Sequence, residues 1–155
     1  MNIGIALDNS LNERWNKEIF FIKKKVQDEG GVVSFRTAFG LPNSQFENVR
    51  DMIANDKIDV LILVPVDAIY AKVIVDYAYE HRVKVIAYSR PIEHEKVDFH
   101  IKFDVPAIGR QQGQYALDKK KKGNYLIIQG TALNTYAQKY YKLQNTPVHI
   151  GNINM

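Results

Sequence analysis

Cysteine is absent from the 155 residues of the sequence. Its absence excludes disulfide scaffolds, cysteine-ligated metals and cysteine nucleophiles, and it fits both oxidising and reducing compartments. Long apolar runs are lacking too, so no segment approaches the roughly 20 residues of a membrane-spanning helix. The first residues have the pattern of a strand and not of a signal peptide. We therefore expect either a cytosolic protein or the mature part of an exported one.

Positively charged residues exceed negatively charged ones only slightly. The net charge is +4, which is too little to argue for a nucleic-acid partner. The composition, 46% hydrophobic and 25% charged residues, is that of an ordinary soluble globular protein. The length suits one domain with a substantial core.

Motifs of nucleotide and hydrolytic chemistry are missing as well. The turn after the first apolar run, 7–10, has no glycine to admit a pyrophosphate, and Asp8 would repel one. No phosphate-binding loop, nucleophile elbow or His-Glu-x-x-His motif occurs. His94 lies between two glutamates, but no other ligand is spaced to complete a metal site. We expect no cofactor, no metal and no enzymatic activity.

What is present is a regular alternation of apolar runs and amphipathic segments. Strands separated by helices of 10–15 residues indicate right-handed crossovers and a parallel sheet. The expected fold is therefore α/β, a Rossmann-like parallel sheet flanked by helices. Strands are expected at 3–7, 32–35, 58–64, 83–88, 97–101 and 125–128. Helices are expected at 15–29, between a capped turn at 41–44 and a stop at 55–56, at 68–81 and at 105–120.

The first strand and the turn that follows it carry the strongest local signal. Small residues alternate with Ile3, Ile5 and Leu7, as in a central strand covered on both faces. The turn then delivers Arg14 and Trp15, the only tryptophan. An indole beside a guanidinium makes a platform for a sugar or an anion. The alternative is that Trp15 belongs to the core and Arg14 pairs with a glutamate one helical turn on, and the local pattern leaves both open.

Polar residues follow the other expected strands too. The carboxyl ends of parallel strands share one rim, where open α/β sheets place their ligands. Arginine, carboxylate and carboxamide groups together suit a polyhydroxylated ligand better than a phosphate, because hydroxyls both donate and accept. The candidate site residues are Asp8, Asn9, Arg14, Trp15, Ser89, Arg90, Asp104 and Asn134.

Four short segments placed in order after successive strands resemble the type 1 periplasmic sugar-binding proteins, and among them the D-xylose-binding branch. The segments are Glu13-Arg14-Trp15, Val64-Pro65, Ala87-Tyr88-Ser89-Arg90 and Phe103-Asp104. In that family two Rossmann-like lobes close over a monosaccharide without catalysis.

The resemblance implies a role for individual residues. Arg14 and Arg90 would hydrogen-bond the sugar from lobe one, and Trp15 would stack on its ring. Asp104 would lie near the hinge strands, and Asn134 would be a first contact from lobe two.

Three departures from the family pattern concern the identity of the sugar. Ser89 stands where the pattern Ala-Tyr-Asp-Arg has a carboxylate. Val105 follows Asp104 where a polar residue is usual, and Thr135 and Tyr136 replace a pair of Asn-like positions.

The resemblance also suggests a division of the chain. We expect an N-terminal sugar-binding lobe at 1–104, a crossover helix and the start of an incomplete second lobe at 105–145, and a hinge-return segment at 146–155. Most of lobe two would be absent between about Asn145 and Thr146, since two lobes need about twice this length. A strand at 124–129 would then lack partners, which predicts self-association as a homodimer or a partner protein.

Two functions are therefore expected. The first is an extracellular or periplasmic solute-binding protein, tethered at the cell surface or free, that delivers a monosaccharide to a membrane permease; a pentose is expected, with D-xylose as the first candidate. The alternative is a module that engages a membrane sensor kinase, with the sugar shifting its conformation. A sugar-responsive repressor would need a DNA-binding headpiece before the first strand, and none is expected here.

Overall fold

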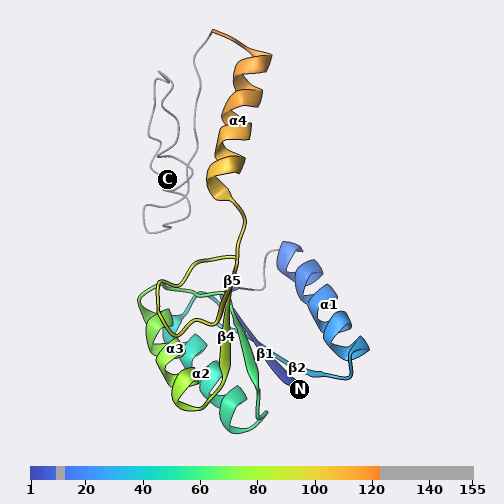
Figure 1. Ribbon diagram of the computed structural model, residues 1–155, viewed down its shortest axis with the longest axis vertical. Coiled ribbons are helices and arrows are strands. Elements are labelled where there is room, and N and C mark those ends of the chain that lie inside the picture. The colour runs from blue at the N-terminus through green and yellow to red at the C-terminus, as the bar shows by residue number, and fades with distance from the viewer. Residues whose placement is uncertain (10–12, 123–155) are drawn as a thin grey trace. The chain divides into compact units, whose positions relative to one another are not determined.

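In the computed structural model, residues 1–9 and 13–122 are described. They contain a five-stranded parallel sheet, which confirms the predicted fold class. The strands are β1 (Asn2–Leu7), β2 (Val32–Thr37), β3 (Val60–Leu63), β4 (Lys84–Tyr88) and β5 (Phe99–Ile101), in the order β2-β1-β3-β4-β5 (Figure 1). The strand expected at 125–128 lies outside the described residues.

The helices of the described residues are α1 (Glu13–Asp28), α2 (Pro42–Ala54), α3 (Tyr70–Glu80) and α4 (Val105–Lys119). The expected capped turn at 41–44 is wrong, because α2 already begins at Pro42 and Leu41, its N-cap, makes no side-chain capping bond. Proline fits the first helical position, where no N–H is needed. The third helix begins two residues later than expected. There the Asp67 carboxylate accepts the backbone N–H groups of Ile69 and Tyr70, at 2.9 and 2.8 Å.

The chain divides into two compact units, 1–102 and 103–155. The first holds the whole sheet and α1 to α3. In the second, the described part is 103–122 and contains α4. The Asp104 carboxylate caps that helix by accepting the Ala107 N–H at 3.0 Å.

Within the first unit the sheet is covered on both faces, α1 on one side and α2 with α3 on the other (Figure 1). Successive side chains of β1 point to opposite faces of the sheet, so they pack alternately against α1 and against α2 with α3. Ile3, Ile5 and Leu7 join the α1 cluster, while Ala6 joins the cluster under α2 and α3. Gly4 also faces α2 and the turn that follows it, where an added Cβ would lie 3.2 Å from Met52 Sδ and 2.6 Å from Ile58 Cδ1. The small residues of β1 are thus what lets the helices pack close.

Register brings the carboxyl ends of the central strands together. Ala6 of β1 lies beside Leu63 of β3, and Leu63 lies beside Ala87 of β4. The residues that follow these three strands therefore start from one line along the edge of the sheet. None of the described helices is both long and apolar enough to cross a membrane.

Candidate functional site

One arginine joins the ends of the three central strands. Arg90, just beyond β4, donates from Nη1 to Asp8 Oδ2 and to the Pro65 carbonyl, both at 2.6 Å. Asp8 follows β1 and Pro65 follows β3. The Asp8 side chain is only 16% exposed, so the ion pair is largely shielded from water. Arg90 thus joins the ends of β1, β3 and β4 at one edge of the sheet.

A buried glutamine holds the β3 end of this rim. Gln45 of α2 is 2% exposed, donates to the Val64 carbonyl at 2.8 Å and accepts the Val66 N–H at 2.9 Å. These two bonds flank Pro65 and so fix the carbonyl that Arg90 uses. The residue was missed in the sequence. Its signal is a polar side chain on the apolar stripe of α2, in register with Val49 and Met52.

A second arginine reaches the same edge from α1. Arg14 donates from Nη2 to Ser89 Oγ at 3.2 Å and from Nε to Glu18 Oε1 at 2.5 Å. Its Cζ lies 4.6 Å from the centroid of the Trp15 ring, a cation–π distance. Since Ser89 precedes Arg90, both guanidinium groups belong to the carboxyl edge of the sheet.

Tyr88 completes this second group. Its hydroxyl donates to Glu18 Oε2 at 2.7 Å, and its ring lies 6.3 Å from that of Trp15 at an angle of 57°. Burial, and then the neighbouring Glu18 carboxylate, raises the pKa of Tyr88 to about 12. The phenol therefore stays protonated and remains a donor at neutral pH.

The turn at Ser89 positions both arginines, because Ser89 accepts a hydrogen bond from Arg14 and directly precedes Arg90. Ser89 has φ of +64°, and the Arg90 N–H donates to the Tyr88 carbonyl across it at 2.7 Å. A left-handed conformation outside glycine costs about 1–2 kcal/mol. The Ser89 N–H donates to the Ile101 carbonyl of β5 at 2.7 Å, which helps hold the turn.

Six of the eight predicted site residues lie in the first unit: Asp8, Asn9, Arg14, Trp15, Ser89 and Arg90. Asp104 belongs to the second unit as the N-cap of α4, and Asn134 lies outside the described residues. The local alternative considered for the first turn is present, because Trp15 is 8% exposed within the α1 cluster and Arg14 pairs with Glu18. A stacking role for Trp15 stays a prediction.

Among residues 1–9 and 13–122, no group of three or more acidic or histidine side chains is arranged to hold a metal. His94 Nε2 lies 3.5 Å from Asp76, and its Nδ1 accepts the Lys96 N–H at 3.2 Å. The ring is thus occupied by protein partners on both nitrogens.

A family model described as "Periplasmic binding protein domain" matches residues 3–144. The chain belongs to this family. Among curated proteins, the D-xylose-binding periplasmic protein of Escherichia coli K12 is 31% identical over 140 residues, which are 90% of this chain and 42% of that protein. The protein of the same name from Haemophilus influenzae is 29% identical over 144 residues, 93% of this chain and 43% of its own. The resemblance found in the sequence is confirmed.

Solved structures of periplasmic binding proteins share the fold. A carbohydrate transporter solute-binding protein from Chloroflexus aurantiacus, in complex with D-glucose, has a TM-score of 0.81 and 32% identity, over 92% of this chain and 43% of that one. The fructose-binding periplasmic domain of a hybrid two-component system has a TM-score of 0.81 and 26% identity, over 99% and 52%. The chain spans less than half the length of the curated relatives named here.

The rim offers both kinds of hydrogen-bonding group. Arg14 and Arg90 supply N–H donors, the Asp8 carboxylate and Pro65 carbonyl supply acceptors, and the Ser89 hydroxyl can do both. The names of the relatives describe binding proteins, in agreement with the expectation of a non-catalytic chain.

Proposed function

We propose that this chain supplies the first lobe of a non-catalytic binding site for a monosaccharide, with D-xylose as the first candidate. The observation that carries the proposal is the pair of arginines anchored at one edge of the sheet, Arg90 on Asp8 and Arg14 on Ser89. Each is held by protein partners before any ligand arrives, and preorganised donors lower the entropy lost on binding.

The family relatives support the choice of ligand class. Two of them are named for D-xylose, and solved neighbours are named with glucose or fructose. Ser89, which replaces the carboxylate of the family pattern, is the residue we expect to shift the preference among sugars, because a hydroxyl accepts more weakly than a carboxylate. Asn9, Trp15, Asp104 and Asn134 are the remaining proposed contacts.

Calorimetric titration of the full chain with D-xylose, D-ribose, L-arabinose, D-glucose and D-fructose tests the proposal. Binding of at least one sugar is expected, and Arg90→Ala should weaken it about tenfold to a hundredfold, the value of a charge-assisted hydrogen bond. Arg90→Lys keeps the charge but loses the planar guanidinium, so its sugar affinity should lie between that of Arg90→Ala and that of the unaltered chain.

Arg50→Ala is the matched control. Arg50 lies on α2 and pairs with Glu47 at 3.2 Å, with 55% of its side chain exposed. Its loss should leave the titration unchanged. Absence of heat with every sugar would exclude the proposed ligand class for this chain.

A second candidate is a sensory role, in which the same lobe engages a membrane sensor kinase and not a permease. The specific observation in its favour is the neighbour from a hybrid two-component system. Capture of the chain by the kinase ectodomain or by the permease, each with and without sugar, separates the two. Sugar-dependent capture by the kinase alone would support the sensory role. Capture by the permease alone would exclude it.

A further inference from the structure

We propose that Glu18 is a positioning residue of the site, one that fixes the Arg14 guanidinium against Trp15 and Ser89. Its consequence for sugar affinity rests on the proposed function. Glu18 was not among the residues expected to bind a ligand, and it acts through Arg14 and not by touching the sugar.

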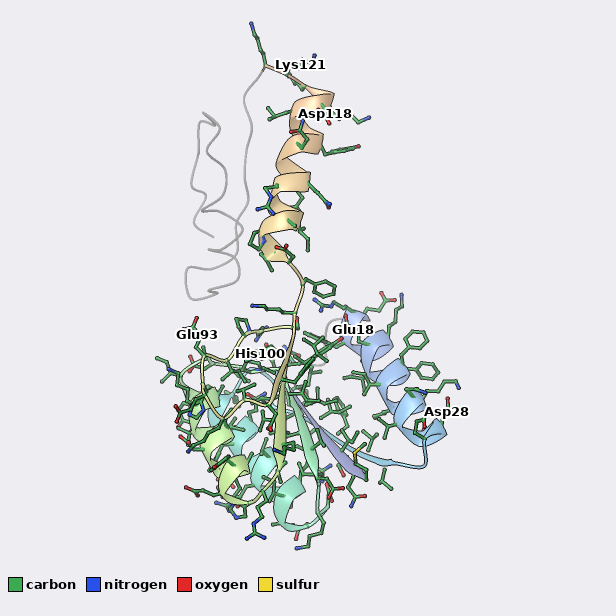
Figure 2. The ribbon with its side chains drawn as sticks, viewed as in Figure 1. Glu18, Asp28, Glu93, His100, Asp118 and Lys121 are labelled. Atoms are coloured by element: carbon green, nitrogen blue, oxygen red, sulfur yellow. The ribbon has the colours of Figure 1, made fainter. Side chains whose placement is uncertain are left out.

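The two oxygens of Glu18 bind two different elements. Oε1 accepts from Arg14 Nε of α1 at 2.5 Å, and Oε2 accepts from the Tyr88 hydroxyl at the end of β4 at 2.7 Å. Glu18 stands on α1 in Figure 2, one turn beyond Arg14. The carboxylate therefore ties the helix to the strand as well as holding the arginine.

Arg14 extends this hydrogen-bond network from another nitrogen of its guanidinium. While Nε is held by Glu18, Nη2 donates to Ser89 Oγ at 3.2 Å, one residue after Tyr88. Hydrogen bonds join Tyr88 to Glu18, Glu18 to Arg14, and Arg14 to Ser89. Because Ser89 follows Tyr88 in the chain, the network forms a closed ring. A guanidinium fixed at two of its nitrogens cannot rotate about its last side-chain bonds, so its plane is set.

This pair differs from the other helical ion pairs of α1. Glu13 and Lys17 pair at 2.9 Å with side chains 81% and 72% exposed, whereas Glu18 is 24% exposed and Arg14 42%. Exposed ion pairs contribute little to folding stability. A partly buried carboxylate that accepts from two donors is instead held in one geometry. Glu13 is therefore the matched control for Glu18 on the same helix.

Trp15 reports the position of Arg14 without any ligand. It is the only tryptophan of the chain, and the guanidinium lies over its ring. Release of Arg14 should open that face of the indole to solvent and raise its quenching by iodide. Glu18→Ala and Arg14→Ala are both expected to raise quenching, and Glu13→Ala, which makes the same change of charge as Glu18→Ala, to leave it as in the unaltered chain.

The deciding measurement is a double-mutant cycle on sugar affinity. Glu18→Ala should weaken binding about tenfold in the unaltered chain and have no further effect in the Arg14→Ala background. Glu18→Gln keeps an acceptor for Arg14 and should restore part of the affinity. Urea midpoints for each variant check that the chain is folded.

The outcomes separate the inference from the proposed function. If no sugar binds the unaltered chain, the function fails, and the iodide measurement alone decides whether Glu18 holds Arg14. If sugar binds and Glu18→Ala binds equally well, the inference fails while the function stands. A loss that persists in the Arg14→Ala background would equally overturn it, because Glu18 would then act by another route.

Discussion

Gln45 is the residue whose replacement tests how the rim is built. Its side chain bonds the backbone on either side of Pro65, and it is almost fully buried. Gln45→Ala leaves a buried carbonyl and a part-buried N–H without their partner, so we expect a loss of about 1–3 kcal/mol in the free energy of unfolding. Urea denaturation measures it.

The same variant should also weaken any sugar binding that depends on Arg90, because the Pro65 carbonyl is one of its two acceptors. Gln45→Glu is the informative companion, since it keeps the size and the acceptor for Val66 but loses the donor to Val64. Unfolding free energies equal to that of the unaltered chain in both variants would contradict the assignment.

Residue-scale features of the site were only partly predictable. The candidates Asp8, Arg14, Ser89 and Arg90 followed from a rule about strand ends. Their partners did not follow, because Arg14 and Ser89 are 75 residues apart and Tyr88 and Glu18 are 70 apart. Such pairs depend on register and on helix rotation, which a single sequence does not encode locally.

At the scale of elements, one carboxylate adds to the backbone pairing that holds β5 to β4. Asp98, just before this strand, accepts from Lys84 Nζ and from the Val85 N–H, both at 2.8 Å. The strand itself is short and exposed, and within the described sheet it pairs only with β4. Asp98 thus fastens the start of β5 to the start of β4.

Asp98→Ala should loosen that edge before the rest of the sheet. We expect the amides of β5 to exchange with solvent faster, and the free energy of unfolding to fall by about 1 kcal/mol. Hydrogen exchange resolved by residue is the measurement. Asp28→Ala, which removes an exposed partner of Lys24 on α1, is the control and should leave β5 unchanged.

Element boundaries show where sequence patterns stop being informative. The strand expected at 97–101 starts only at Phe99, because the Asp98 side chain is committed to β4. Runs of apolar residues predicted the existence and type of β1 to β5, and the pattern is strongest for β1 and β3, whose residues are mostly buried. Strand and helix ends depend on single side-chain contacts, and those are invisible to periodicity.

For the molecule as a whole, the lowered carboxylate pKa values predict how it responds to acid. Hydrogen bonds from Asn55 and then Arg36 lower the pKa of Asp51, and Lys96 and Lys84 lower those of Asp76 and Asp98. Because each folded pKa lies below the unfolded value of 3.8, the unfolded chain binds more protons there.

The stability from these groups is therefore full above the unfolded pKa and is lost as pH falls through the folded values. Urea midpoints measured from neutral pH down to about pH 2 should decline below about pH 4. The triple variant Asp51→Asn, Asp76→Asn and Asp98→Asn should show a shallower decline. An equally steep decline in that variant would assign the acid sensitivity to other groups.

The strand order also affects how the chain folds during synthesis. β1 is made first, yet its two neighbours in the sheet are β2 and β3, so its second edge stays open until Val60–Leu63 have been synthesised. Parallel pairing of distant segments is slow. During that interval a strand that is mostly buried in the folded protein is exposed on one side, and a chaperone that shields Ile3 to Leu7 would speed productive folding.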